Sequence, residues 1–465
     1  MNSCPRILIS AAHKSSGKTT VSIGLCAALS RDSRVQPYKK GPDYIDPMWL
    51  GMASGRDCYN LDFYTMPKAE IMSTLACHSQ DADISIIEGN KGLYDGLDLD
   101  GSNSNAALAS LLGAPVVLVI DARGMTRGIA PLILGYQAFD PHIHIAGVIL
   151  NQLGGKRHES KLRQVIEHYT DVRVIGSVYR KPELEIEERH LGLIPSNEDG
   201  YADKKIRSIG NYIAGQVDID LIRQIAATAA PCPVECQPLS QDLSVDKLRI
   251  GVVKNEAFGF YYPGDLHALE QAGADIVPVD TITEDHLPQL DGLFIDGGFP
   301  ESRMQQLEDN SGMRASIRQA VQDGLPVYAE CGGLMYLSRQ LEWQGKTCQM
   351  VGAIPGDTVM ESKPQGRGYI IIRPTEQHPW HSSDSDNAVI AGHEFHYSRL
   401  VNLDPDLRYA YSMERGTGID GKHDGIVINN MLACYSHLRD TDNYHWARNF
   451  IAHIRRTRKN HGDNT

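Results

Sequence analysis

The stretch RILISAAHKSSGKTTVSIGL, residues 6–25, decides the fold of the first half of the chain. Its opening residues form an apolar run typical of a buried β-strand, and a helical pattern follows from about Thr19 to Leu29. A strand, a glycine-bearing turn and a helix in this order are typical of a P-loop, in which backbone N–H groups and a lysine hold phosphate. We therefore predict a nucleotide phosphate site whose residues are Gly17, Lys18, Thr19 and Thr20.

The turn itself departs from the standard P-loop, because Ala12 stands where the first glycine is expected. A serine- and glycine-rich turn that only caps a helix is the alternative interpretation. The strand before the turn and the helix after it favour the phosphate site.

Further apolar runs predict the rest of an α/β fold. Runs that are nearly continuous in Val, Ile and Leu are typical of parallel strands covered by helices on both faces. In the first half they occupy residues 83–89, 114–122, 144–152 and 172–180, and residues 155–170 have a helical pattern. In the second half we predict strands at 248–254, 274–280, 291–298 and 326–330, with helices at 264–273 and 304–323. The pattern predicts an N-terminal doubly wound parallel sheet, followed by a second α/β domain.

Two segments lack this pattern and set the predicted domain boundaries. Residues 213–247 include a stretch rich in Pro, Ser and Ala that has no clear periodicity, which is typical of an interdomain linker. The polar residues 455–465 are expected to form a frayed tail. The predicted domains are therefore residues 1–212 and 248–454.

Composition narrows the class of protein. A length of 465 residues suits two or three domains, and a formal net charge of −13 disfavours binding to nucleic acid or to anionic membranes. No apolar run approaches the roughly 20 residues that span a bilayer. The nine cysteines are an odd number in a large chain, which argues against a disulfide framework. We expect a cytoplasmic globular protein.

Carboxylates gather in two segments, one of which forms a turn while the other ends a predicted strand. The segment KKGPDYIDPMW, residues 39–49, and the segment IIEGNKGLYDG, residues 86–96, contain four of them: Asp43, Asp46, Glu88 and Asp95. Each of these carboxylates alone is typical of a solvated loop, but four carboxylates near one phosphate site favour a bound Mg²⁺ ion. Asn151 closes another predicted strand, where it is either a ligand of a nucleotide base or a plain turn asparagine.

The segment VYAECGGLMYL, residues 327–337, holds the one cysteine whose surroundings suggest chemistry. A strand, a tight turn at Cys331 and a helical start form the thiol counterpart of a nucleophile elbow. Backbone N–H groups of Gly332 and of Gly298, in the segment DGGFPE, are candidate donors to an oxyanion. The helix N-terminus would lower the thiol pKa. The alternative is a buried structural cysteine, which is our interpretation of the other eight.

A cysteine nucleophile needs a base, which can lie far away in the sequence. His437 in ACYSHLRD is the best candidate, and His393 and His396 in GHEFHYS compete with it. With such a base, Cys331 is placed to attack a carbonyl carbon.

These segments together resemble the cobyrinic acid a,c-diamide synthase family. The family joins an ATP-dependent amide ligase domain, related to dethiobiotin synthetase, to a class I glutamine amidotransferase domain of the flavodoxin-like α/β class. Nine segments occur in the family's order: SSGKTT, KKGPDYIDPMW, NLDFY, EGNKGLYDG, RHLGLIP, AFGFYYP, GGFPE, ECGGLMYL and GHEFHYS.

The resemblance implies a reaction in two parts. Cys331, with His437 as base, would hydrolyse glutamine to supply ammonia. ATP and Mg²⁺ would phosphorylate a side-chain carboxylate of a tetrapyrrole, and ammonia would displace the phosphate. Lys18 and Thr19 would hold phosphates, Thr19, Asp43 and Glu88 would bind Mg²⁺, and Asp46 and Asp95 would position the substrate or its acyl phosphate. The expected partners of the remaining substrate carboxylates are Lys39, Lys40, Arg56 and Arg367. General enzyme habit suggests a homodimer.

The chain departs from the family pattern near the proposed base, His437. Class I amidotransferases usually carry a glutamate two residues after the histidine, where this chain has Arg439; Glu394 is an alternative partner for a histidine.

The identity of the substrate stays open. Sirohydrochlorin or sirohaem could replace cobyrinic acid, since the motifs serve a carboxylate and not the ring metal. An alternative of another class is a MinD/ParA-like switch ATPase with an inert amidotransferase-like domain. Lys14, which is one position later than the extra lysine of MinD-type loops, and the intact Cys331 elbow argue against it.

Overall fold

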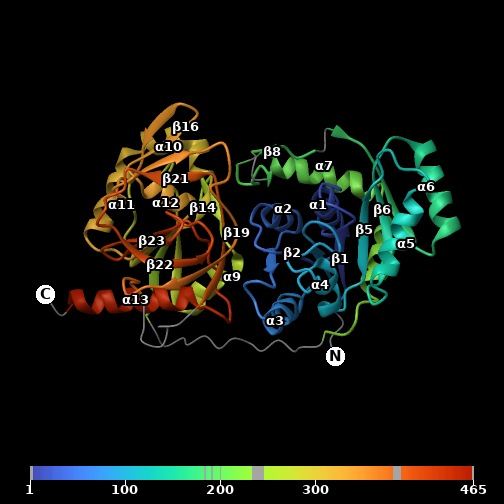
Figure 1. The fold of residues 1–465 in the computed structure, drawn as a ribbon, viewed down its shortest axis with the longest axis horizontal. Helices are drawn as coiled ribbons and strands as arrows, with labels where there is room; N and C mark the ends of the chain where they lie inside the picture. Colours follow the sequence, from blue (N-terminus) through green and yellow to red (C-terminus); the bar gives the residue numbers. More distant parts are fainter. Residues whose placement is uncertain are drawn as a thin grey trace. The chain divides into compact units, whose positions relative to one another are not determined.

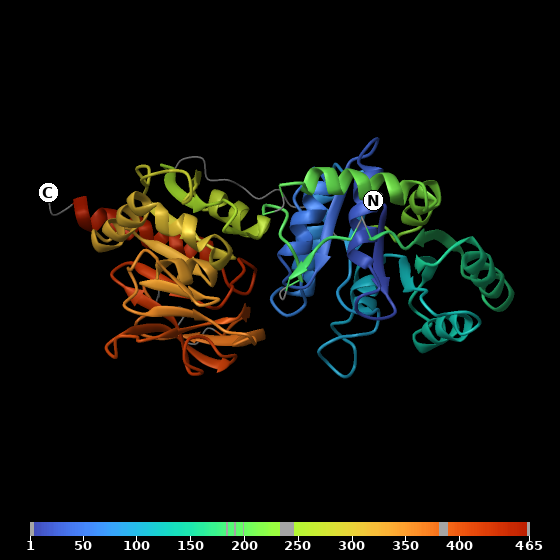
Figure 2. The same ribbon diagram turned by 90° about the horizontal axis from the view of Figure 1, so that it is seen from above.

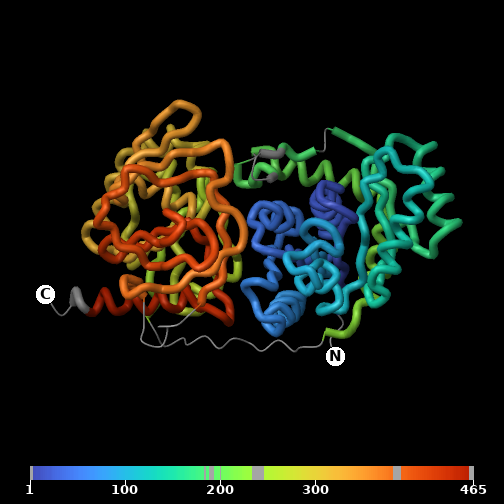
Figure 3. The backbone as a smooth tube through the Cα atoms, in the orientation of Figure 1, coloured from blue at the N-terminus to red at the C-terminus, as the bar shows by residue number. Residues whose placement is uncertain are grey.

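The computed structural model describes residues 4–182, 185–189, 192–198, 200–232, 246–380 and 389–462. The chain divides into two compact units, Met1–Pro238 and Leu239–Thr465 (Figure 1). Figure 3 follows the backbone through the blue and green first unit and then through the yellow to red second unit.

The N-terminal unit is built on a sheet of seven parallel strands, ordered β3-β2-β4-β1-β5-β6-β7. This confirms the predicted parallel sheet. Its strands are β1 Arg6–Ala11, β2 Val35–Lys40, β3 Tyr59–Leu61, β4 Ile84–Glu88, β5 Val116–Asp121, β6 Ile145–Leu153 and β7 Val174–Tyr179. Its helices are α1 Lys18–Leu29, α2 Ile45–Ser54, α3 Lys68–His78, α4 Asn105–Leu112, α5 Ile129–Phe139, α6 Lys156–Tyr169, α7 Ala202–Ala214 and α8 Ile219–Ala226, and a hairpin pairs β8 Glu188–Arg189 with β9 Gly192–Leu193.

Helices cover both faces of this sheet. Apolar side chains of α3, α4, α5 and α6 form one core with the strands. On the other face α1 packs closely against α7, because two glycines leave room for the contact. A Cβ on Gly24 would lie 2.3 Å from Ile213, and a Cβ on Gly210 would lie 2.7 Å from Ala27. This doubly wound arrangement puts the P-loop and the ends of the neighbouring strands at one edge of the sheet.

The predicted linker, residues 213–247, contains a helix that the sequence analysis did not assign. α8 buries an apolar face formed by Ile222 and Ile225, a repeat too short to stand out in the sequence. Beyond it, the Ala230 N–H donates to the Gly113 carbonyl at 3.0 Å. The first part of this segment therefore packs onto the N-terminal unit, whereas residues 233–245 lie outside the described residues.

The C-terminal unit is built on a nine-stranded mixed sheet, ordered β12-β10-β13-β15-β24-β23-β22-β19-β20. The first five strands in this order are parallel, as predicted for an α/β domain, and the others are antiparallel. The parallel strands are β10 Leu248–Val253, β12 Ala274–Val279, β13 Gly292–Ile295, β15 Val327–Glu330 and β24 Met431–Cys434. The antiparallel strands are β19 Gly366–Pro374, β20 Ile390–His396, β22 Arg408–Arg415 and β23 His423–Ile428.

Smaller elements complete this unit, and Figure 2 shows its yellow and red helices beside the orange strands. A four-stranded sheet contains β16 Gln340–Trp343, β17 Lys346–Gln349, β18 Asp357–Met360 and β21 Ser398–Val401, and β11 Phe258–Phe260 pairs with β14 Gly297–Gly298. The helices are α9 Pro263–Gln271, η2 Pro300–Arg303, α10 Met304–Asp309, α11 Ser311–Gln322, α12 Gly332–Leu337 and α13 Trp446–Gly462.

Two predictions about these helices are wrong. The helix expected at 304–323 is broken at Asn310, whose side chain caps α11 by accepting from the Met313 N–H at 3.2 Å. The tail expected to fray from Arg455 instead continues α13 to Gly462, and Arg458 there pairs with Asp291 at 3.3 Å. Among the described residues, no helix has both the length and the apolar character that a membrane crossing requires.

Candidate active sites

The P-loop joins β1 to α1 through a tight turn. Gly17 has φ of 82°, a left-handed conformation that favours glycine, and a Cβ there would lie 2.1 Å from Asn151 Nδ2. Lys18 is the first residue of α1, and burial lowers its pKa. The start of this helix therefore offers backbone N–H groups and a buried ammonium to an anion.

Two residues outside the P-loop hold it in place. Asn151, near the end of β6, donates its amide to the Ser16 carbonyl at 2.9 Å and is buried. The Tyr136 hydroxyl of α5 donates to the Ala12 carbonyl. In the structure Asn151 supports the loop, and a contact with a nucleotide base stays a prediction.

The structure brings together four residues predicted to surround the phosphates. Glu88 ends β4 next to β1 in the sheet, and the Thr19 hydroxyl donates to Glu88 at 2.8 Å and to Asp46 at 3.2 Å. The Lys39 ammonium lies between the carboxylates, bonded to Asp46, at 3.0 Å from Glu88 and at 3.7 Å from Asp43. Thr19 is therefore held between two carboxylates that are also paired with an internal cation.

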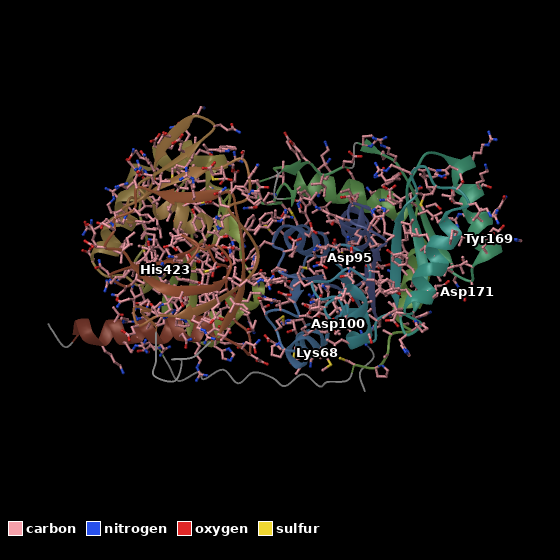
Figure 4. The ribbon with its side chains drawn as sticks, in the orientation of Figure 1. Lys68, Asp95, Asp100, Tyr169, Asp171 and His423 are labelled. Carbon is pink, nitrogen blue, oxygen red and sulfur yellow. The ribbon has the colours of Figure 1, made fainter. Side chains whose placement is uncertain are left out.

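Asp95 lies on the loop between β4 and α4, where Figure 4 labels it together with Asp100. Its carboxylate accepts from the Gly92 N–H at 2.9 Å. This turn packs against the beginning of the P-loop, since the Leu93 N–H donates to the Ala11 carbonyl at 2.8 Å. The negative charge of Asp95 raises the pKa of Lys18 and so opposes part of the lowering by burial.

The oxygen atoms around Thr19 suit Mg²⁺. One carboxylate oxygen of Glu88, Oε2, is buried and has no hydrogen-bond partner among the described residues. Burial raises the pKa of Glu88, and the nearby Asp46 carboxylate raises it further. A buried carboxylate oxygen without a donor is costly unless a cation binds it, and Mg²⁺ prefers such oxygens. The residues present therefore fit the metal that the sequence analysis predicts.

Lys39 and Arg56, which the sequence analysis expects to meet substrate carboxylates, are both paired within the chain. The Lys39 side chain is buried and pairs with the carboxylates described above, and a contact with a substrate stays a prediction. Arg56 pairs with Asp81 at 2.7 Å. Lys40 donates to the Asn90 side chain at 3.2 Å, and the Arg367 guanidinium lies over the Phe395 ring.

Replacing Lys39 with methionine is expected to destabilise the N-terminal unit. The change leaves buried carboxylates without their cation, which costs about 3–5 kcal/mol of the free energy of unfolding in the absence of Mg²⁺. Added Mg²⁺ should restore part of the loss, because it would bind the same cluster of carboxylates. Hydrogen exchange of amides in β1 and β4 measures this opening free energy for the N-terminal unit alone.

The exposed ion pair of Arg34 with Asp83 gives the control for this prediction. Replacing Arg34 with methionine should change the free energy of unfolding far less, because an exposed ion pair contributes little, and the change should not respond to Mg²⁺. A Lys39→Met variant as stable as the Arg34 control would contradict the account of the buried cluster.

Cys331 lies in a strained turn between β15 and α12. Its φ of 45° and ψ of −98° are unusual for a residue with a side chain, and its N–H donates to the Cys434 carbonyl at 2.7 Å. The side chain is only 7% exposed. This is the strand–turn–helix geometry predicted for a nucleophile elbow.

His437 reaches Cys331 from the next strand of the sheet. β13, β15 and β24 are neighbours and parallel, so the residues that follow them meet at one edge. His437 Nδ1 lies 3.2 Å from Glu330 Oε2 and 3.4 Å from Asp296 Oδ1. Burial by itself lowers the pKa of His437, but hydrogen bonds with Asp296, Cys331 and Glu330 outweigh it and raise that pKa well above its usual value.

The competing histidines have other surroundings. The His393 ring stacks on His437 with centroids 4.9 Å apart, and the His396 ring stacks on Tyr435 at 3.8 Å. Glu394 lies 3.6 Å from His396 and accepts from the backbone N–H groups of the loop at 417–418. The histidine beside Glu394 is therefore His396, whereas the carboxylates beside His437 are Glu330 and Asp296.

The predicted oxyanion donors lie close to one another. A Cβ on Gly332 would lie 2.9 Å from the Gly298 nitrogen, and a Cβ on Gly297 would lie 2.8 Å from His437 Cε1. Only glycine allows these backbones to approach so closely. The assignment of Gly298 and Gly332 to an oxyanion stays a prediction.

Sequence reasoning missed two functional candidates at this site, Asp296 and Glu330. Each follows or ends a strand next to a glycine-bearing turn, at the edge of the sheet where Cys331 lies. That position is the signal that could have identified them.

The N-terminal half matches the family model of the CobQ/CobB/MinD/ParA nucleotide binding domain over residues 7–194, and residues 249–443 match that of the CobB/CobQ-like glutamine amidotransferase domain. The chain is 44% identical to a cobyrinate a,c-diamide synthase of Magnetococcus marinus, over 98% of both chains. It is 42% identical to that of Methanosarcina acetivorans, over 94% of this chain and 92% of the relative, and 40% identical to that of Archaeoglobus fulgidus, over 96% and 97%. The chain belongs to the cobyrinate a,c-diamide synthase family.

Proposed function

We propose that this chain amidates the a- and c-side-chain carboxylates of cobyrinic acid, using glutamine as nitrogen donor and ATP to activate each carboxylate. The single observation that carries the proposal is a P-loop and a Cys331–His437 pair within one chain of this family. A carboxylate is a poor acyl donor, and ammonia is mostly protonated at neutral pH. One site must therefore activate the acid while another supplies unprotonated ammonia.

In the C-terminal unit, the Cys331 sulfur attacks the side-chain amide carbon of glutamine. His437 takes the thiol proton and passes it to the departing nitrogen, so that ammonia leaves and a thioester remains. Backbone N–H groups of Gly298 and Gly332 stabilise the negative oxygen of the tetrahedral intermediate. Water then hydrolyses the thioester, which releases glutamate and restores the thiol.

In the N-terminal unit, a carboxylate oxygen of the substrate attacks the γ-phosphorus of ATP, and ADP leaves. Lys18 and the start of α1, including Thr19 and Thr20, neutralise the phosphate charge. Ammonia then attacks the acyl phosphate, and inorganic phosphate and one proton leave as the amide forms. Asp46 and Asp95 orient the carboxylate and its acyl phosphate.

Mg²⁺ is the metal that these residues fit. Thr19, Asp43 and Glu88 would hold it, and Asp46 lies close enough to Thr19 to orient that hydroxyl. When bound, the ion would neutralise charge on the phosphates of ATP.

Two other functions are less well supported. Amidation of sirohydrochlorin or sirohaem would use the same chemistry, but the relatives described above are cobyrinate a,c-diamide synthases. A MinD/ParA-like switch ATPase would leave the buried Cys331–His437 pair without a role. The name of the N-terminal family model includes MinD and ParA, but that model covers only residues 7–194.

Mass spectrometry of tetrapyrroles incubated with protein, ATP, Mg²⁺ and glutamine tests the substrate. Cobyrinic acid should gain two amides, whereas sirohydrochlorin and sirohaem should gain none. Amidation of sirohydrochlorin in preference to cobyrinic acid would replace the proposed substrate. ATP hydrolysis without any amidation would favour the switch ATPase.

A further inference from the structure

Class I amidotransferases usually carry a glutamate two residues after the catalytic histidine, but this chain has Arg439 at that position. The Arg439 guanidinium lies over the Tyr262 ring. We propose that Glu330, the residue directly before the nucleophile, is the positioning residue that orients His437, with Asp296 as a second carboxylate beside it. This inference rests on the proposed function, since it needs His437 to serve Cys331.

Glu330 is held on both sides of its carboxylate. One oxygen, Oε2, lies 3.2 Å from His437 Nδ1. The other, Oε1, accepts from the Leu438 N–H at 3.0 Å and from the Tyr328 hydroxyl. Because Leu438 follows His437 directly, Glu330 fixes both the imidazole ring and the backbone that carries it. The side chain is only 1% exposed, so water does not compete for these bonds.

Asp296 adds a weaker contact from the neighbouring strand. Its Oδ1 lies 3.4 Å from His437 Nδ1 and accepts from the Gly297 N–H at 2.5 Å. Burial, together with the adjacent Glu330, raises the pKa of Asp296 to about 8. The shift shows that the two buried carboxylates repel each other, so Asp296 is the less strongly ionised partner of His437.

This geometry determines which nitrogen of His437 serves the thiol. With Nδ1–H donated to Glu330, the other nitrogen, Nε2, is left as the proton acceptor for Cys331. The charged partner also stabilises the imidazolium that forms when the thiol loses its proton. Glu330 therefore does for His437 what the missing glutamate does in other class I amidotransferases.

Replacing Glu330 with glutamine tests the assignment. The glutamine amide favours the wrong tautomer of His437, so kcat of glutaminase should fall on the order of 100-fold with little change in KM. The pH at which iodoacetamide alkylates Cys331 half-maximally should rise, because the thiolate–imidazolium pair loses its carboxylate. The groups that face His437 are Cys331, Asp296, Glu330 and His393, with Arg439 two residues away. Amidation with free ammonia should be unchanged.

Glu394→Gln is the matched control, because Glu394 is also a buried glutamate next to a histidine, His396. It should leave both the glutaminase rate and the alkylation profile unchanged. If Glu330→Gln also loses ammonia-dependent amidation, the Glu330→Asp variant is used in its place to test the role of Glu330. That variant keeps the charge, so it should retain the wild-type alkylation profile with a reduced kcat.

Normal glutaminase activity and a normal alkylation profile in Glu330→Gln would overturn the inference, as would a shifted alkylation profile in Glu330→Asp. These outcomes are distinct from failure of the proposed function, which would show as glutaminase activity in a Cys331→Ser variant.

Discussion

Replacing Cys331 with serine is expected to abolish glutamine-dependent amidation while amidation with free ammonia continues. Loss of a catalytic nucleophile lowers the rate by at least about 10⁴-fold. A serine hydroxyl holds its proton far more tightly than a thiol, and the buried His437 is arranged for a thiolate. Glutamate release from glutamine and amide formation, each measured with glutamine and with ammonium chloride, check both halves of the prediction.

Cys348→Ser is the control for this change, because Cys348 is another buried cysteine of the same unit. Its thiol lies 3.9 Å from the Gln305 side-chain oxygen, a position where a hydroxyl can also donate. The control should keep glutaminase activity. Glutamine-dependent amidation that survives in Cys331→Ser would contradict the assignment of the nucleophile.

Replacing Lys18 with alanine is expected to abolish amidation with both nitrogen donors and to leave glutaminase activity in place. Lys18 brings the buried ammonium of the P-loop, and without it the phosphate charge that develops on transfer is not neutralised. Loss of one such stabilising group costs at least about 10²–10³-fold in rate. ADP release and amide formation measure the loss.

Lys14→Ala is the matched control, since Lys14 is an exposed lysine of the same loop. It should reduce amidation by less than about tenfold, because an exposed charge contributes little. A Lys18→Ala variant that still forms amides with ammonia would show that phosphate is held elsewhere. A large loss in Lys14→Ala would instead support the switch-ATPase type of loop.

The parallel strands could be predicted because each is a nearly continuous apolar run. The antiparallel strands, such as β19 and β22, were not assigned, because neither is a continuous buried run: β19 buries three of its nine residues and β22 two of its eight. The break at Asn310 was hidden because helical periodicity continues on both sides of the cap. α8 was missed because its apolar repeat spans only two turns.

The same limit applies to the sites. Lys18, Thr19 and Cys331 are recognisable because a local strand–turn–helix pattern surrounds each of them. Glu330 and Asp296 have a role only through His437, which is more than 100 residues away along the chain from Glu330, so sheet order and not local sequence brings them together. The pairing of Lys39 with Glu88 could not be predicted, because the sequence does not show that the Lys39 side chain turns back toward this carboxylate.

Ammonia made at Cys331 is expected to be consumed at the P-loop site. To test this, the protein is incubated with cobyrinic acid, ATP, Mg²⁺ and glutamine that carries ¹⁵N in its side-chain amide, in the presence of unlabelled ammonium. The mass of the product is then measured by mass spectrometry. The wild-type protein is expected to place the label in two side-chain amides, whereas Cys331→Ser is expected to form only unlabelled amides. Labelled amides formed by Cys331→Ser, or no amides formed by the wild-type protein, would contradict this expectation.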